Sequence, residues 1–399
     1  MSQLLNERWS ETKEALLEGL SGVRKSSMNV CLENTRKYLA ESASAGATTA
    51  GNIATLNRVI LPVIRRVMPT VIANEIIGVQ PMTGPVGQIH TLRVRYADTS
   101  ANDQVVAGDE ALSPFKIAAG YSGNNLSTNT TAANSSKAAN TAVLEGSAGK
   151  RMSIQILKAP VEAKSRKLSA RWTFEAAQDA QSQQGIDIEA EIMAALAQEI
   201  TAEIDQEILN SLRLLASVEQ SYDQSLVSGT ATFVGDEHAA LAIQINRVAN
   251  LIAQRTRRGA ANWAVVSNQA LTILQSATTS AFARTTEGTF EAPTNTKFVG
   301  TLNGAMRIYV DAYKTDTDDN NQVLVGYKGT SEADAAAFYC PYIPLMSSGV
   351  VLDPNTFEPV VGFLTRYGYV ELNNTASSLG NAADYLGKVA IENATVSFR

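Results

Sequence analysis

The sequence predicts an α+β protein that contains one long helix, one long pair of strands and a smaller unit of alternating helices and strands. Apolar residues recur every three or four positions from Ile192 to Leu215, which is the period of a helix buried along one side. Residues 89–96 and 151–158 instead alternate with a period of two, as strands do. Between residues 238 and 345 both periods follow one another, which is typical of a compact α/β layer unit.

The composition indicates a globular protein with room for two or three structural units. Its 399 residues are 45% hydrophobic and 18% charged, which is enough to bury a substantial core. The net charge of −6 argues against a nucleic-acid binder with one large basic field, although a shell that only faces DNA is compatible with it. Cys31 and Cys340 are the only cysteines, so we expect two unlinked thiols rather than a disulfide framework or a zinc site.

The N-terminal stretch predicts two amphipathic helices and then a flexible linker. Residues 4–39 place apolar residues at helical spacing without the unbroken apolar run of a signal peptide or membrane span, so we expect a cytoplasmic protein. Residues 41–54 are almost all small, which predicts a linker that separates these helices from the body. Helical spacing returns at 56–68, where we interpret Arg65 and Arg66 as a solvated or intersubunit face rather than a DNA contact.

Residues 86–160 are interpreted as a long two-stranded arm. The turn-forming segment 78–88, with three glycines and two prolines, precedes the first strand, and no phosphate-binding glycine motif occurs anywhere in the chain. Between the two strands, residues 120–149 contain only two charged residues and are dominated by Asn, Ser, Thr, Ala and Gly. Because such a tip buries little apolar surface, we expect it to become ordered only against a neighbouring subunit.

The long helix is expected at 186–217. Gly185 ends the preceding turn, and carboxylates crowd the next turn, where the helix dipole favours them. A helix of this length is roughly 45 Å long, which suits a strut better than an active-site cradle. Its acidic residues Glu199, Glu203 and Glu207 line the side away from the apolar stripe.

A mixed-sign cluster precedes this helix and is set against its acidic side. We expect its four charged residues to pair between subunits: Glu162, Lys164, Arg166 and Lys167. Exposed pairs of this kind are individually weak, at about 0–1 kcal/mol each.

The remainder of the chain predicts the α/β unit and a set of closing strands. Residues 218–236 are expected to be a polar loop, and residues 346–399 to return as strands to the sheet beside the long helix. The elements expected between them are helices at 238–253 and 268–277 and strands at 262–267, 306–313, 322–329 and 335–345.

No motif in the chain predicts an enzyme. The two histidines, His90 and His238, have no nearby cysteine or carboxylate cluster, and the acidic run at 316–321 lacks the glycine and the closing glutamate of a calcium loop. Hydrolase, metalloprotease and kinase signatures are also missing. We therefore expect no catalytic residues, no cofactor and no metal.

Several uninterrupted blocks carry a resemblance to a known family. They are RRVMPTVIANEIIGVQPMTGPVG (65–87), EAKSRKLSARWTFEAAQD (162–179), RRGAANWAVVS (257–267), GYKGTSEADAAAFYCPYIPL (326–345) and FEPVVGFLTRYG (357–368). On these blocks the chain resembles the major head protein of T-even-type tailed bacteriophages. The resemblance implies the capsid fold shared by tailed phages and herpesviruses, with an N-arm at 42–85, an E-loop at 86–160, a P domain with the spine helix at 161–237, an A domain at 238–345 and return strands to the P domain at 346–399.

The resemblance also implies a function. It predicts a structural protein that forms hexamers and then an icosahedral or elongated head, assembled in the host bacterial cytoplasm. Its implied partners are further copies of itself, the vertex, portal, scaffold and decoration proteins, and packaged double-stranded DNA bound non-specifically, with no membrane. Two alternatives stay open, namely the pentameric vertex paralogue of the same head and an encapsulin-type compartment.

A maturation cleavage is the last expectation. Prohead proteases of the phages that this chain resembles cut after Leu/Ile-x-Glu, and this triplet occurs three times before residue 42 and nowhere after it. The third triplet, Leu39-Ala40-Glu41, opens onto Ser42 and a run of small residues that leaves the backbone accessible to a protease. We therefore predict a cut between Glu41 and Ser42 that removes residues 1–41 as a propeptide.

Overall fold

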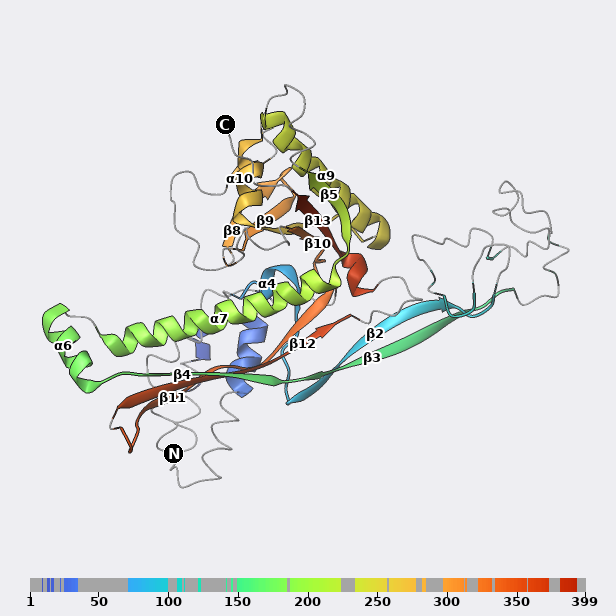
Figure 1. Ribbon diagram of the computed structural model, residues 1–399. Helices are drawn as coiled ribbons and strands as arrows, with labels where there is room; N and C mark the ends of the chain where they lie inside the picture. Colours follow the sequence, from blue (N-terminus) through green and yellow to red (C-terminus); the bar gives the residue numbers. More distant parts are fainter. Residues whose placement is uncertain are drawn as a thin grey trace. The chain divides into compact units, whose positions relative to one another are not determined.

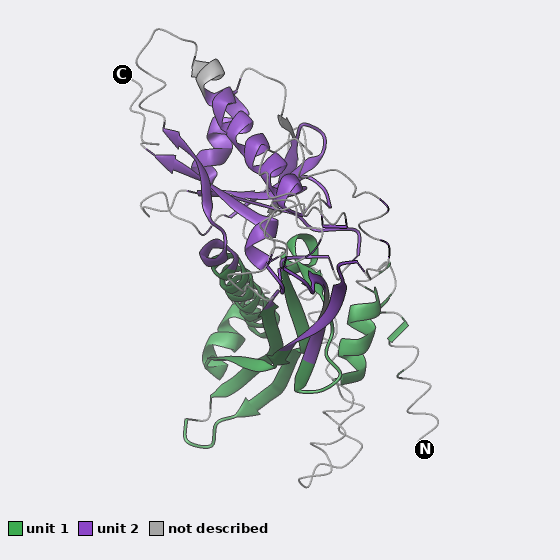
Figure 2. Ribbon diagram, turned by 90° about the vertical axis from the view of Figure 1, so that its right-hand side faces the viewer, with its two compact units in different colours: residues 1–87, 160–211, 337–370 green, residues 88–159, 212–336, 371–399 purple. Residues whose placement is uncertain are grey.

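The computed structural model describes two compact units built from interleaved parts of the chain. Unit 1 comprises residues 1–87, 160–211 and 337–370, and unit 2 comprises residues 88–159, 212–336 and 371–399 (Figure 2). The longer described stretches are 25–34, 71–99, 149–184, 187–223, 234–256, 258–277, 297–311, 322–331, 334–356, 358–372 and 381–392, with shorter pieces between them. Both helices and sheets occur in the fold, so the α+β class expected from the sequence is confirmed.

Unit 1 contains a four-stranded sheet. Its strands follow the order β1 (Gly78–Val79), β11 (Ala337–Leu352), β12 (Pro359–Glu371) and β4 (Lys164–Arg171) (Figure 1). β1 pairs with β11 in parallel, and β12 pairs with β4 antiparallel. Every second residue of β12 from Pro359 to Tyr367 is buried, which is the period of a strand that covers a core with one face.

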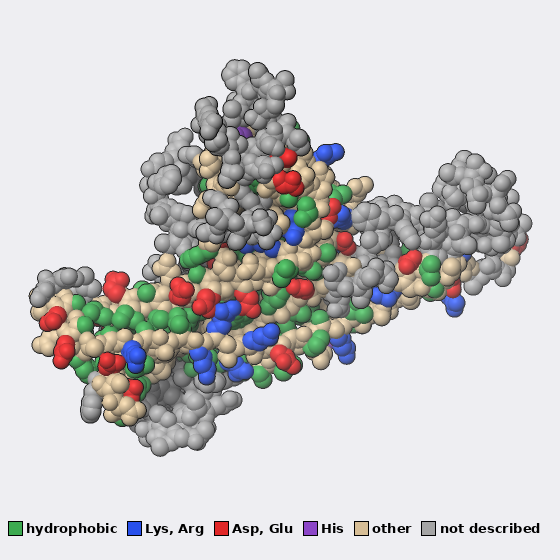
Figure 3. All heavy atoms as spheres, in the orientation of Figure 1, with side chains coloured by type: hydrophobic (Ala, Val, Ile, Leu, Met, Phe, Trp, Pro, Cys, Tyr) green, Lys and Arg blue, Asp and Glu red, His purple; other side chains and the backbone are tan. Residues whose placement is uncertain are grey.

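The long helix α7 (Ile188–Leu215) is the main helix of unit 1, and its last four residues belong to unit 2. The expected apolar stripe is confirmed, since Ile200, Ile204 and Ile208 are at most 2% exposed. Figure 3 shows acidic side chains in a row over α7 and Lys and Arg side chains over β4. Two shorter helices, α4 (Ala73–Ile76) and α6 (Phe174–Gln184), also belong to unit 1.

A helix at residues 25–34 packs into unit 1. Met28, Cys31 and Leu32, which share one side of it, are at most 2% exposed. The expectation that the N-terminal helices are separated from the body is therefore wrong for this helix, because its apolar side is buried. Both cysteines are free thiols, as expected. The linker at 41–54 and the helix expected at 56–68 lie outside the described residues.

Unit 2 contains a seven-stranded sheet. Its strands follow the order β5 (Val218–Asp223), β13 (Leu386–Glu392), β10 (Gln322–Gly326), β6 (Trp263–Val266), β9 (Met306–Val310), β8 (Lys297–Leu302) and β7 (Phe282–Arg284). Its described helices include α9 (Val234–Thr256), α10 (Asn268–Ser276) and the short 3-10 helix η2 (Ala382–Tyr385). α10 starts where Ser267 caps it, its hydroxyl accepting a hydrogen bond from the amide of Ala270 at 3.2 Å.

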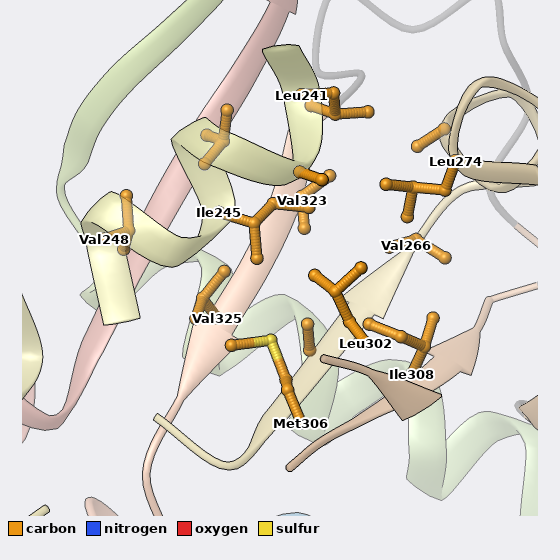
Figure 4. Close-up of a cluster of buried hydrophobic side chains, with 14 of the residues drawn as sticks. Leu241, Ile245, Val248, Val266, Leu274, Leu302, Met306, Ile308, Val323 and Val325 are labelled. Carbon is orange, nitrogen blue, oxygen red and sulfur yellow. The ribbon is translucent and has the colours of Figure 1, made fainter. Parts of the chain in front are cut away.

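The core of unit 2 lies between α9 and the sheet. α9 packs on β13, β5 and β10, and its apolar stripe confirms the expected helix. The stripe points at side chains of the sheet and of α10 (Figure 4). Leu241, Ile245 and Val248 of the stripe are fully buried, as are Val266, Val323 and Val325 of the strands.

Three expectations about this unit are wrong. The closing strand β13 pairs with β10 and β5 and not with the sheet beside the long helix. β11 starts at Ala337 but belongs to the four-stranded sheet, so residues 337–345 are not part of the α/β unit. Residues 218–223 form the strand β5 rather than a loop, because a polar edge strand needs to bury only one side chain, Tyr222.

The predicted arm is a two-stranded sheet of β2 (Val86–Tyr96) and β3 (Met152–Glu162). Towards the tip, the rings of Tyr96 and Tyr121 lie 4.5 Å apart between centroids. The Tyr121 hydroxyl donates to the carbonyl of Arg151 at 2.6 Å, and Arg151 forms an ion pair with Asp98. The two strands are confirmed, whereas most of the tip at 120–149 lies outside the described residues.

Candidate functional site

A polar cluster joins β4 to α7 within unit 1. We define this β4–α7 cluster as Arg166, Glu203, Glu207 and Tyr367. The guanidinium of Arg166 donates to Glu203 at 2.6 Å, to Glu207 at 2.5 Å and to the hydroxyl of Tyr367 at 2.6 Å. The Tyr367 hydroxyl in turn donates to the Glu207 carboxylate. The guanidinium of Arg166 thus donates hydrogen bonds to two carboxylates and one phenol hydroxyl.

Strand register and helix period explain why these residues meet. Arg166 on β4 is opposite Thr365 on β12, and Lys164 is opposite Tyr367, so these side chains share one face of the sheet. Glu203 and Glu207 are four residues apart and therefore neighbours on one side of α7. The acidic side of the helix therefore meets the basic side chains of the edge strand through the helix period together with the long-range register of β4 on β12.

The cluster shifts the ionisation of its members. Burial alone would raise the pKa of Glu207, but hydrogen bonds from Arg166 and Tyr367 outweigh it and hold the pKa below its ordinary value. Burial and the hydrogen bond to Glu207 raise the pKa of Tyr367. Burial alone would lower the pKa of Arg166, but its hydrogen bonds to Glu207 and Tyr367 raise it. The cluster therefore holds a charged Arg166 and Glu207 beside a neutral phenol at neutral pH.

The structure changes the interpretation of the mixed-sign cluster expected from the sequence. Arg166 uses its guanidinium within its own chain, so the acidic side of α7 that it contacts is not that of a neighbour. The other three residues, Glu162, Lys164 and Lys167, are exposed. The remaining site residues named from the sequence lie outside the described residues: Leu39, Ala40, Glu41, Ser42, Arg65 and Arg66.

An apolar stripe on the arm was not identified from the sequence. Met152, Ile154 and Ile156 on β3 are 53%, 68% and 61% exposed and lie on one side of the strand, because they are spaced by two. Three large apolar side chains in a row are unusual on a free surface. The signal was present in the sequence as the alternation Met-Ser-Ile-Gln-Ile at 152–156.

A second exposed apolar segment lies at the end of β11. Val350, Val351 and Leu352 are 41%, 56% and 50% exposed and lead into the turn towards β12. The turn is closed by a hydrogen bond from the amide of Asp353 to the carbonyl of Glu358 at 3.0 Å. The sequence predicts strands in this region, but its pattern does not show that the apolar residues beside the turn would be exposed.

The two histidines occupy ordinary structural positions. His90 on β2 is exposed, and His238 on α9 is buried with its Nδ1 atom 2.5 Å from the hydroxyl of Ser276. In the described part of the chain no three His, Cys, Asp or Glu side chains are grouped to hold a metal ion. No described helix is long and apolar enough to span a membrane.

The family model and the related sequences point to the same family. Residues 53–391 match the family model described as Major capsid protein Gp23. The major capsid protein of Vibrio phage KVP40 is 30% identical over 423 residues, which cover 85% of this chain and 81% of that protein. The major capsid protein of Enterobacteria phage T4 is 30% identical over 433 residues, covering 86% and 80%. Among solved structures, the mature capsid of bacteriophage PhiM1 aligns with a TM-score of 0.44 at 12% identity, over 78% of this chain and 84% of that chain.

Proposed function

Because the chain belongs to the family of the major capsid protein Gp23, we propose that its copies assemble as hexamers into the closed head of a tailed bacteriophage. The protein is a major capsid protein, which is a structural protein and not an enzyme. Membership of this family shows that the protein is a capsid protein, whereas the hexamer and the order of assembly are our proposal. The matching family and the related phage proteins are all major capsid proteins, which favours this role over that of the vertex paralogue.

The exposed stripe on β3 is the observation that carries the proposal. A two-stranded sheet has no second layer to cover an apolar side, so it is marginally stable in water on its own. Burying three side chains of this kind against another subunit stabilises the contact by about 1.5–3 kcal/mol each before the entropy of association is subtracted. A neighbouring copy of this chain supplies the missing layer.

The double variant Ile154→Asp/Ile156→Asp tests this proposal. We expect the isolated subunit to keep its free energy of unfolding to within about 0.5 kcal/mol, because both side chains are solvent-exposed there. Closed shells should become too few to detect by electron microscopy, since burying two carboxylates without partners is costly. Gln155→Asp, on the other side of the same strand, is the matched control and should assemble normally. Wild-type yield from the double variant would contradict the proposal.

Charge pairing at the exposed residues Glu162, Lys164 and Lys167 adds specificity to the same contacts. Each pair contributes about 0–1 kcal/mol, but a shell repeats each contact in every subunit. Arg65 and Arg66 are proposed to face a neighbouring subunit. Arg166 is assigned to the chain's own fold, since its donors are engaged by Glu203, Glu207 and Tyr367.

Maturation is proposed to remove residues 1–41. A prohead protease would hydrolyse the Glu41–Ser42 peptide bond, and the family match begins only at residue 53, downstream of this bond. Mass spectrometry of the shell protein from DNA-filled virions tests the cut. A chain that begins at Ser42 is expected, and one that begins at Met1 or Ser2 would refute processing.

The remaining partners follow from the place of a capsid protein in the particle. We propose that assembly takes place in the host cytoplasm together with vertex, portal, scaffold and decoration proteins. Packaged double-stranded DNA would be contacted non-specifically, since a net charge of −6 does not support one strong basic field. Salt-dependent affinity of the free subunit for random DNA above that of an acidic control protein would contradict this weak contact.

A further inference from the structure

Asn34, in the helix at residues 25–34, makes a polar contact with the body of unit 1. The side-chain amide of Asn34 donates to the carbonyl of Met82 at 2.7 Å and to the carbonyl of Tyr342 at 3.0 Å. Asn34 is 5% exposed and Met82 is 6% exposed, so the bond to Met82 is protected from water, whereas the bond to the half-buried Tyr342 is partly protected. A single side chain therefore bridges the segment after β1 to the strand β11.

Met82, which accepts one of these hydrogen bonds, also packs with its side chain beside the start of the arm. A methyl group added to Gly87, at the start of β2, would lie 3.7 Å from the Met82 side chain, and one added to Gly368 on β12 would lie 3.5 Å from its sulfur. Both positions also lie within 3.5 Å of Val161 on β3. Met82 thus packs where the two strands of the arm leave unit 1.

We propose that residues 25–34 act as a clip that keeps the base of the arm ordered, and that removal of residues 1–41 releases it. The arm base is defined as residues 78–87 and 160–163. The first half of the proposal concerns the uncut chain, and only the second half rests on the proposed cleavage after Glu41. In this proposal the cut loosens the arm base, which is the part of the fold that carries the arm to a neighbouring subunit.

The physical basis is the loss of a hydrogen-bond donor for one buried and one partly buried carbonyl. While the chain is intact, the clip is held near its site at an effective concentration on the order of millimolar. After hydrolysis the peptide 1–41 is a separate molecule and dissociates on dilution. The carbonyls of Met82 and Tyr342 then lose their shared donor, and the apolar site of Met28 and Leu32 becomes exposed.

Three backbone amides report on the arm base. Gln80 and Met82 donate to carbonyls of β11, those of Tyr339 at 2.9 Å and Pro341 at 3.0 Å, and Ala163 donates to the carbonyl of Pro85 within the arm base at 2.9 Å. Their hydrogen exchange measures local opening, whereas amides of β6 in unit 2 serve as an internal reference for global unfolding.

The first experiment compares the uncut full-length chain with Asn34→Ala. Removing two hydrogen bonds of about 1 kcal/mol each should speed exchange of the three reporter amides by roughly 30-fold while β6 stays unchanged. Lys25→Ala is the control, because Lys25 is exposed and lies about 180° round the same helix from Asn34. The control should change exchange by no more than about twofold. Equal acceleration of the reporter amides and β6, or no acceleration, would overturn the clip.

The second experiment cuts the chain at the proposed position. The recognition sequence of a site-specific protease is inserted between residues 41 and 42 of the full-length chain, which is then cleaved and diluted. We expect peptide 1–41 to separate on gel filtration and the reporter amides to lose protection. A cut chain that keeps the protection of the uncut chain would overturn release. The virion measurement is independent, because an uncut virion protein would refute cleavage without altering the Asn34→Ala result.

Discussion

The sheet core of unit 2 and the two-stranded arm use the same kind of side chain in opposite ways. Ile245 on α9 is fully buried, whereas Ile154 and Ile156 on β3 are 68% and 61% exposed. The difference lies in the layers: a helix covers the seven-stranded sheet, whereas Ile154 and Ile156 lie on a ribbon whose described strands are β2 and β3. Apolar residues in a layered unit stabilise the subunit itself, while apolar residues on a lone ribbon stabilise its contact with another molecule.

The largest expected effect on folding comes from a buried ion pair in unit 2. The guanidinium of Arg213 donates to the carboxylate of Asp311 at 2.7 Å, and the two side chains are 9% and 0% exposed. Arg213→Met leaves the carboxylate buried without its counter-charge, which should lower the free energy of unfolding by about 3–5 kcal/mol in urea. The double variant Arg213→Met/Asp311→Asn should recover part of this loss. A single variant as stable as wild type would show that unit 2 does not depend on the pair.

A slightly smaller effect is expected from the apolar core of the same unit. Ile245→Ala removes a side chain with no exposed surface and should cost about 2–5 kcal/mol of unfolding free energy. The matched control is Ile243→Ala on the same helix, because Ile243 is 62% exposed and should change stability by at most about 0.5 kcal/mol. If Ile245→Ala and Ile243→Ala lower the unfolding free energy equally, burial under a second layer does not explain how apolar residues stabilise this unit.

Local periodicity explains which parts of the fold could be predicted. The helices α7 and α9 and the strands of the arm were predicted because their patterns depend only on residues a few positions apart. β13 was assigned to the wrong sheet, since its partners β10 and β5 are far away in sequence. Both sheets contain short alternating strands, so pattern alone does not decide which sheet a strand joins.

The candidate site shows the same limit. Arg166 and the acidic side of α7 were identified as opposite charges that would meet, and they do meet. Whether the carboxylates belong to the same chain or to a neighbour is decided by the register of β4 on β12, which the sequence does not encode locally. The stripe on β3 was read only as a strand, because period two does not reveal which side of a strand stays uncovered.

The β4–α7 cluster should contribute less to folding, and in a pH-dependent way. Because the folded-state pKa of Glu207 lies below its ordinary value of 4.5, its stabilisation is present above that pH and is lost as the pH falls through the lowered value. Its side chain is 36% exposed, so we expect Glu207→Gln to cost about 0.5–1 kcal/mol at pH 7. The gap to wild type in urea unfolding should shrink as the pH falls below 4.5. If the difference in unfolding free energy between wild type and Glu207→Gln does not change with pH, the loss comes from packing and not from the charge of Glu207.

The smallest effect on folding, with a large effect on assembly, is expected from shortening the arm. The Nζ atom of Lys150 lies 5.3 Å from the ring centre of Tyr121, so side chains from the two sides of the tip are in contact. The variant deletes residues 123–148 and joins residue 122 to residue 149 through a short glycine-rich linker. This deletion keeps Tyr121, which packs on Tyr96 and donates to the carbonyl of Arg151. The free energy of unfolding should stay within about 0.5 kcal/mol of wild type, while the yield of closed shells falls.

The matched comparison is a deletion of residues 121–148, which also removes the Tyr121 anchor. It should additionally speed hydrogen exchange at the end of the arm, where the amide of Ala97 donates to the carbonyl of Arg151 at 3.0 Å. If the shorter deletion assembles as well as wild type and only the longer one fails, the ordered ribbon is what a neighbour recognises and the polar tip is dispensable. If both fail equally while β2 and β3 stay protected, the tip itself makes the contact.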